Sequence, residues 1–555
     1  MKKITFVLLS VFFVCGLSAQ DKLLNTLQTE INRNMSVLKE QPVPAYYLSY
    51  RVHDRENYSI QSSFGTIIAS VPSKFRLYHI SLRVGNHEMD NTREIKDDDF
   101  SENYFAGDNI MIHEDDSYAI QRALWLKTDE YYKNALKKYE KVKANVAVKV
   151  ASEDKSNDFS VEKAEKYYEK PLSMKNILGD IKKWEDKMRK YSDVFSDNKD
   201  LISGSASFQV ELLRKYFADS DGSLIVENIY GYRISIDAST IAEDGMNLPL
   251  YKSYFAHRIE DLPSDAQIIA DVKNISKMVS DLRKAPVAES YSGPVLMTAK
   301  ASGVFFHEIF GHRIEGARLK QETDAQTFKK KIGELVLPED FSITFDPQIK
   351  EYKNLKLSGS YVFDDEGVKG QKVKVVENGV LKTFLMSRVP IEGFPNSNGH
   401  GRGMIYFNTV TRQSNMIVES SKAKTNKELR DMLIEEAKKT NKPYAYLIDD
   451  VSGGFTTTGR YMPNAFNVTP LIVYRVYVDG RPDELVRGVD LVGTPLAMFS
   501  QIAACGDDFE VFNGSCGAES GSLPVSCVAS SLFVKMVETQ KMSKSQSQPP
   551  ILERP

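Results

Sequence analysis

The strongest constraint on this 555-residue chain is a short apolar segment, Gly303–His312, that carries two histidines and a glutamate. The remaining residues of the segment are glycine, valine, isoleucine and phenylalanine, so the segment is typical of a buried helix. Imidazoles are zinc ligands, and a carboxylate beside a metal-activated water can serve as a general base. His307, Glu308 and His312 therefore form a candidate metal and catalytic site.

The spacing of the two histidines restricts the local backbone. The familiar arrangement, His-Glu-x-x-His, places two ligands four residues apart on one helix face. Here His307 and His312 are five residues apart, which separates them by about 140° on a regular helix. A shared metal thus requires a π-bulge or a helix end near Gly311. The alternative is two unrelated histidines in a buried helix.

A hydrolytic zinc site needs a third protein ligand and an open position. Cys516 is a candidate, because it lies in the segment Asn513–Gly517, which is interpreted as a flexible turn. Cys505 and Cys527 flank it symmetrically. These two can form a disulfide or remain free thiols, and the sequence leaves both alternatives open.

The N-terminus has the pattern of a secretory signal peptide: a basic start, an apolar run over Ile4–Val14, and a stretch of small residues after it. This pattern predicts cleavage after Ala19. A membrane anchor is the alternative, but the run is shorter than the roughly 20 residues that span a bilayer. A lipoprotein at Cys15 would need small residues before it, where Phe13 and Val14 stand. We expect an exported protein, periplasmic or secreted, without a transmembrane segment in the mature chain.

The composition is that of a globular protein of several domains. The 72 basic and 75 acidic residues give a net charge of −3, which argues against a nucleic-acid partner. Changes in residue pattern predict six regions, listed here by number: signal peptide 1–19, strand-rich region 20–115, charged helical insertion 116–200, mixed α/β region 201–287, catalytic domain 288–540 and disordered tail 541–555. The predicted fold class is α+β, with a β-rich C-terminal domain that carries one metal-binding helix.

Several separated blocks resemble the TldD/PmbA family of metallopeptidases, on the metal-carrying, TldD-like side. The blocks are Tyr291-x-Gly293-Pro294-Val295, His307-Glu308-x-x-Gly311-His312-x-x-Glu315-Gly316, Gly359-Ser360-Tyr361 with Asp364-Asp365-Glu366-Gly367, Glu377-Asn378-Gly379, Arg412-x-x-Asn415, Gly453-Gly454, Val486-x-Gly488-x-x-Leu491-x-Gly493 and Gly514-x-Cys516-Gly517. The helical insertion and the signal peptide depart from the family pattern.

The resemblance implies roles for particular residues. His307, His312 and Cys516 would hold one zinc ion or another divalent transition metal, and Glu308 would be the catalytic acid and base. The family also implies a peptide substrate, short or unfolded and bound in an enclosed cleft. It further implies a homodimer or a heterodimer with a PmbA-like partner.

Three further residues are candidates for supporting roles. Glu315 can orient a metal-binding side chain by contacting it on the side away from the metal, or it can be a surface carboxylate. His400 and Arg402 can contact a substrate carboxylate, or they can belong to a solvated loop. The acidic run Asp364–Glu366 is interpreted as a turn capped by carboxylates rather than a calcium site.

These observations predict an exported zinc-dependent metallopeptidase in which Glu308 is the general base. The alternative is a non-catalytic, metal-stabilised binding or assembly subunit of a TldD/PmbA-type complex. Glu308 argues against that alternative, since a purely structural zinc site needs no acid at that position.

Overall fold

A computed structural model describes residues 21–95, 109–148, 154–321, 324, 326–459, 466–542 and 551–552. The predicted signal peptide and nearly all of the predicted tail lie outside these residues. No helix in these ranges is long and apolar enough to cross a membrane. The fold is mixed α/β with a β-rich C-terminal region, which confirms the predicted fold class.

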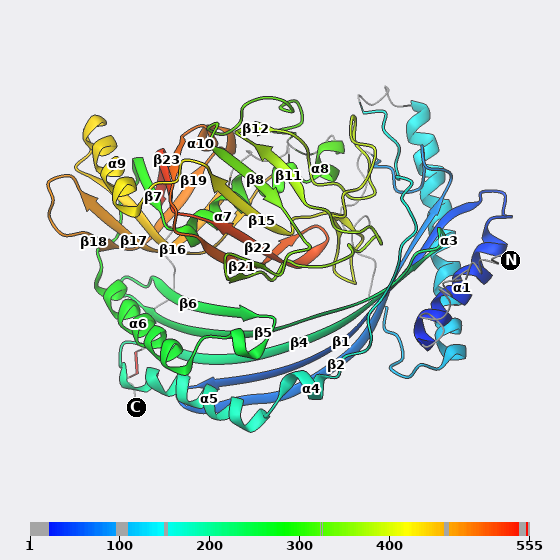
Figure 1. Ribbon diagram of the computed structural model, residues 1–555, viewed down its shortest axis with the longest axis horizontal. Coiled ribbons are helices and arrows are strands. Elements are labelled where there is room, and N and C mark those ends of the chain that lie inside the picture. The colour runs from blue at the N-terminus through cyan, green and yellow to red at the C-terminus, as the bar shows by residue number, and fades with distance from the viewer. Residues whose placement is uncertain are drawn as a thin grey trace, which may run out of the picture.

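The N-terminal half is built on one long, curved sheet (Figure 1). Its strands are β1 (Ala45–Ser63), β2 (Thr66–Val84), β3 (Lys166–Tyr168), β4 (Ser203–Asp219), β5 (Leu224–Ile241) and β6 (Asn247–Ala256). The order is β2-β1-β4-β5, with β3 and β6 both paired to β5. The first two strands form a hairpin closed by Phe64 and Gly65, both at positive φ, as the two-residue turn requires.

Helices cover this sheet at two places (Figure 1). They are α1 (Lys22–Leu38), α3 (Ser117–Val148), α4 (Met174–Leu178), α5 (Ile181–Asp193) and α6 (Asp265–Lys284). α1 and α3 pack together at one end, whereas α5 and α6 lie under the convex face. The apolar stripe of α5 faces the sheet, where Trp184 stacks on Phe208 of β4 at 3.9 Å. The segment 116–200 also contributes β3, so it is joined to the sheet and is not purely helical.

The C-terminal half sits on the concave side of the curved sheet and contains two further sheets (Figure 1). One has the order β12-β11-β8-β15-β22-β21, and the other β16-β7-β23-β19-β17-β18 with β20 beside β23. Their strands are β7 (Tyr291–Met297), β8 (Phe341–Phe345), β11 (Val373–Glu377), β12 (Val380–Leu381), β15 (Asn415–Ser420), β16 (Tyr444–Thr456), β17 (Phe466–Tyr477), β18 (Glu484–Val486), β19 (Val489–Gly493), β20 (Ile502–Cys505), β21 (Glu510–Ala518), β22 (Gly521–Ala529) and β23 (Leu532–Lys541).

Two local features in this half follow from short sequence signals. The Asn378-Gly379 turn joins β11 to β12 with both residues at positive φ. Helix α9 (Asn426–Lys439) begins with a capping box between Thr425 and Glu428. Short-range turn and cap chemistry determined both features.

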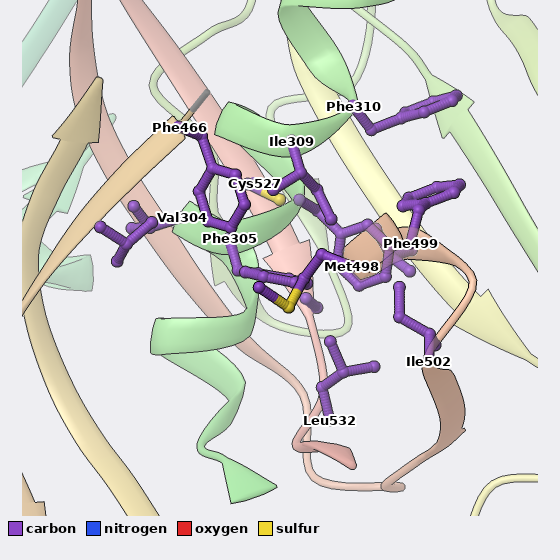
Figure 2. Packing of buried hydrophobic residues seen from close by; sticks show 14 of the residues in the cluster. Val304, Phe305, Ile309, Phe310, Phe466, Met498, Phe499, Ile502, Cys527 and Leu532 are labelled. Atoms are coloured by element: carbon purple, nitrogen blue, oxygen red, sulfur yellow. The ribbon is translucent and has the colours of Figure 1, made fainter. Parts of the chain in front are cut away.

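Helix α7 (Ala299–Ile309) packs between the two C-terminal sheets, against β16 of one and β22 of the other. Figure 2 shows its apolar side chains among residues from β17, β20, β22, β23 and α10 (Pro495–Phe499). Phe305 meets Phe466 edge to face, and Phe310 stacks on Phe499 at 5.2 Å. Each fully buried side chain of this kind contributes about 1.5–3 kcal/mol. The helix that carries the candidate site is therefore held on a rigid core.

Candidate metal centre and catalytic cleft

The backbone changes direction between the two histidines. α7 ends at Ile309, Phe310 takes φ −120° and ψ −52°, and a 3₁₀ turn follows over Gly311–Ile314. This confirms the helix break that the five-residue spacing requires. Close packing enforces the glycine, since a Cβ at Gly311 would lie 2.1 Å from Oε1 of Gln413. The break brings the rings of His307 and His312 to a centroid separation of 4.9 Å.

Cys516 meets both imidazoles. Its Sγ lies 3.2 Å from Nε2 of His307 and 3.3 Å from Nε2 of His312. The candidate donor atoms of the three residues all lie within 4.8 Å of one another, and all three side chains are buried. The prediction of a flexible turn around Cys516 is wrong: the residue lies in strand β21, paired with Leu523 of β22. A hydrogen-bonded strand fixes the thiol more firmly than a loop does.

The electrostatics of this trio favour a metal-binding thiolate. Burial opposes ionisation of the Cys516 thiol, but the adjacent His312 and His307 outweigh it and hold its pKa well below the ordinary value. Burial likewise opposes protonation of His312, yet Cys516 and Glu315 raise its pKa to about 10. One thiolate and two imidazoles are a donor set that suits zinc. The residues present therefore fit a metal ion.

Glu315 orients the ring of His312 through a hydrogen bond to Nδ1. Its Oε2 accepts hydrogen bonds from Nδ1 of His312 at 3.1 Å and from Nε of Arg318 at 2.8 Å. The carboxylate is fully buried; burial would raise its pKa, but His312 and Arg318 lower it to about 2. A proton on Nδ1 leaves Nε2 of His312 free to bind a metal. The structure thus places Glu315 where the orienting role requires it, and it is not a surface carboxylate.

Glu308 is placed differently from Glu315. Its Oε2 is buried and has no hydrogen-bond partner within the described part of the chain. Burial also raises the pKa of this carboxyl. The side chain packs against the backbone of Gly454 on β16, where a Cβ would lie only 2.7 Å from Cγ of Glu308. A buried carboxyl oxygen that lacks a hydrogen-bond partner and lies next to a donor set for a metal can accept a proton from a water molecule. Its position is therefore suitable for a general base.

The trio and Glu308 open onto a cavity of about 840 Å³ between the curved sheet and the C-terminal half. β5 and β6 form one wall, and β16 and β21 form the opposite wall. A cavity of this size accommodates several residues of an extended peptide.

His400 and Arg402 are not in a solvated loop, and neither lines this cavity. His400 is fully buried, with Nε2 3.0 Å from Oγ of Ser414. Arg402 donates to the main-chain carbonyls of Gln413 and Pro524. Both side chains cross-link buried loops, and their predicted contact with a substrate carboxylate is not supported by their positions.

The remaining sequence features are structural. Oδ1 of Asp364 accepts hydrogen bonds from the main-chain nitrogens of Glu366 and Val368, as expected for a capped turn. Cys505 and Cys527 are buried free thiols, not a disulfide.

Sequence reasoning missed two parts of the site. The wall formed by β5 and β6, including Arg233 and Tyr251, carries no motif that points to the metal centre. Gly454 was noted only within a Gly-Gly block, although its lack of a side chain makes room for Glu308. The paired glycines were the one available signal, and only packing reveals their purpose.

A buried Cys/His/His donor set that could hold a metal ion thus lies beside Glu308, in the cleft between the two halves of the molecule. The family model for the PmbA/TldA metallopeptidase C-terminal domain matches residues 290–541. Residues 290–541 are therefore similar to the C-terminal domain of the TldD/PmbA metallopeptidase family.

Sequence relatives agree with that assignment. A metalloprotease of Archaeoglobus fulgidus is 31% identical over 46% of this chain and 54% of its own. A zinc metalloprotease TldD homologue of Saccharolobus solfataricus is 25% identical over 60% of this chain and 70% of its own. The chain matches about half the length of the Archaeoglobus relative and of a Methanocaldococcus jannaschii metalloprotease, which is matched over 47% of its length.

Solved structures extend the likeness to the whole fold. TldE from Thermococcus kodakarensis superposes with a TM-score of 0.60 over 93% of this chain and 100% of its own, at 14% identity. A Thermotoga maritima protein gives 0.59 over 92% and 99%, at 17% identity. At these identities the likeness concerns the fold alone.

Proposed function

We propose that this protein is an exported zinc-dependent metallopeptidase that hydrolyses peptide bonds in short or unfolded peptides. The observation that carries the proposal is the buried Oε2 of Glu308, which has no hydrogen-bond partner among the described residues and lies beside the trio of His307, His312 and Cys516. A structural zinc site closes all four positions with ligands and needs no free carboxyl. The names of the sequence relatives, metalloprotease and zinc metalloprotease, support the class.

His307, His312 and Cys516 hold the metal in this proposal, with Glu315 fixing the ring of His312. A bound zinc ion would supply a Lewis acid that polarises the scissile carbonyl and lowers the pKa of a water molecule. Glu308 then takes a proton from the attacking water and returns it to the leaving amine. Its raised pKa, caused by burial, brings the carboxyl closer to the pH at which it must both accept and donate.

The shape of the cleft supports an extended, flexible substrate. β6, β16 and β21 line it, and β6 and β21 each pair with a strand on one side only. The cavity lies between two halves of the molecule, so a folded protein surface could not reach Glu308. A short or unfolded peptide can enter as a single strand.

Two further parts of the proposal concern the localisation of the protein and its assembly. The basic start and apolar run before Ala19 support export, and N-terminal sequencing of the secreted or periplasmic protein tests it. TldD- and PmbA-named relatives, and the TldE fold, support assembly as a homodimer or with a PmbA-like partner. Light scattering of the purified chain, alone and with such a partner from the same cell, tests assembly.

The function is tested with Glu308→Gln, which keeps the size of the side chain and removes the base. Metal content should stay at the wild-type level, whereas peptide hydrolysis should fall by about 10²–10⁴-fold. Wild-type activity should vanish with a chelator and return with zinc. Turnover of Glu308→Gln near the wild-type rate would instead favour a metal-stabilised binding or assembly subunit.

A further inference from the structure

The cavity contains one cationic side chain that stands apart from the others. Four basic residues of the lining are ion-paired: Lys252 with Asp271 at 2.9 Å, Lys300 with Asp450 at 2.6 Å, Arg318 with Glu519 at 2.6 Å and Lys356 with Asp261 at 3.5 Å. Arg233 of β5 lines the same cavity and has no carboxylate partner among the described residues. Its guanidinium is the uncompensated charge of the cleft.

The contacts of Arg233 are all neutral. Nη1 donates to Oγ of Ser253 at 2.9 Å and to the main-chain oxygen of Asn513 at 3.3 Å, and the guanidinium lies 5.5 Å from the ring centre of Phe255. Burial lowers the pKa of Arg233, and Glu211 offsets this only in part. Glu211 itself is bonded to Arg55 at 3.2 Å. This half-buried charge therefore has no counter-ion among the described residues, although a partly desolvated guanidinium is stabilised by one.

We propose that Arg233 binds a carboxylate of the peptide substrate, either its C-terminal carboxylate or an Asp or Glu side chain. This inference rests on the proposed peptidase function. A guanidinium offers several donors in a fixed plane, so it binds a carboxylate through two parallel hydrogen bonds. A substrate carboxylate would supply the missing counter-ion in a site that is already partly dehydrated.

The position of Arg233 fixes where that carboxylate lies relative to the reacting bond. Asn513, which Arg233 contacts, and Cys516 are three residues apart on the same strand, β21. Three residues of extended strand span roughly 10 Å. A substrate lying along β21 would therefore place its carboxylate about three residues from the scissile bond.

The test compares peptides that differ only in charge. One pair ends in a free carboxylate or an amide, and a second pair carries Glu or Gln three residues from the cleavage point, on an amidated chain. For the wild type, neutralising the recognised carboxylate should lower kcat/KM by about 10–100-fold. The pair that shows this loss identifies the source of the carboxylate.

Variants then assign the preference to Arg233. Arg233→Gln should cleave the charged and neutral peptides with equal kcat/KM, and Arg233→Lys should restore part of the discrimination. Lys252→Gln is the matched control, because it removes a paired cation from the same cavity, and it should keep the wild-type preference. A wild type indifferent to both pairs would overturn the proposal. So would an Arg233→Gln variant that loses rate equally on charged and neutral peptides, which would mark a purely structural link to Asn513.

A binding measurement separates this proposal from the proposed function. Calorimetry with Glu308→Gln reports peptide affinity without turnover, and the charged peptide should bind about 10–100-fold more tightly than its neutral counterpart. Adding Arg233→Gln should abolish that difference. If no peptide is cleaved by the wild type but the charge preference in binding remains, the peptidase function fails while carboxylate recognition stands. Equal binding of both peptides contradicts the role of Arg233.

Discussion

The curved sheet contacts the C-terminal half at two places, and the two differ in whether their charged side chains have partners of opposite charge. At the first, which we call the sealed contact, Arg51 lies 3.3 Å from Asp365 and donates to the main-chain oxygen of Gly403 at 2.8 Å. Lys215 lies 3.5 Å from the same carboxylate and donates to the main-chain oxygen of Phe363 at 2.6 Å. The second is the open cleft, where neither Glu308 nor Arg233 forms an ion pair with any residue that the structure describes.

This difference separates stability from function within one interface. Buried charges that have a partner of opposite charge fix the relative position of two elements, and removing one partner is costly. Buried groups without partners destabilise the fold, and such local violations are typical of functional sites. The sealed contact can thus hold the two halves in place while the cleft keeps unsatisfied groups ready for a substrate.

The largest expected effect is in the open cleft. His312→Ala leaves two of the three metal donors, so zinc affinity should fall at least tenfold and peptide hydrolysis should drop to background. Metal analysis of the purified variant and a peptide assay measure the two effects. The denaturant unfolding curve of the variant should match that of metal-free wild type, since the sealed contact is untouched. If the variant retains one zinc ion per chain, His312 is not a metal ligand.

A substitution at the sealed contact should lower stability and leave metal binding unchanged. Asp365→Asn leaves Arg51 and Lys215 without their shared counter-ion, so unfolding free energy should fall by about 3–5 kcal/mol. Denaturant titration of metal-free protein measures this loss. Zinc binding by the folded variant should stay at the wild-type level. A stability change below about 1 kcal/mol would mean that the contact is not what joins the two halves.

Sequence reasoning reached the local features and missed the ones that depend on long-range packing. The break before His312 followed from helix geometry, and the Asn378-Gly379 turn followed from turn chemistry, because neighbouring residues determine both. The position of Cys516 in a strand was missed, since the glycines and serines around it resemble a turn. Arg51 meets Gly403, 352 residues later; nothing in either local sequence predicts that pairing. Arg233 was missed for the same reason.

The next effect concerns the alignment of the general base. In Gly454→Ala, the new Cβ would lie 2.7 Å from Cγ of Glu308 and 2.6 Å from the main-chain oxygen of Asn467, so the carboxyl must move. Displacing a catalytic group by about 1 Å can cost roughly 100-fold, and we expect kcat to fall by about 10–100-fold with metal content unchanged. Gly459→Ala is the matched control, because no atom lies within 4 Å of its added Cβ. Equal activity of the two variants would show that Gly454 does not position Glu308.

The smallest effect is a pH dependence that belongs to the sealed contact alone. Burial would raise the pKa of Asp365, but Lys215 and Arg51 outweigh it and hold the pKa well below the ordinary value. A carboxyl with a depressed pKa in the folded state stabilises the fold above its unfolded pKa of about 4, and this contribution is lost as the pH falls further. The stability difference between wild type and Asp365→Asn should therefore be constant from about pH 5 to 8. It should shrink by at most about 1.4 kcal/mol for each pH unit below 4.

The neighbouring histidine should not obscure this comparison. Burial and the adjacent Arg51 hold the pKa of His53 well below its ordinary value, so this ring stays neutral in the folded protein. Its protonation on unfolding lowers stability below about pH 6.5 in wild type and variant alike. Asp365 raises the pKa of His53, so its loss only strengthens the preference for the neutral ring in the variant. Urea titrations at pH 3, 4, 5 and 7 on both proteins measure the difference. A gap that stays constant down to pH 3 would mean that Asp365 does not carry the charge that binds Arg51 and Lys215.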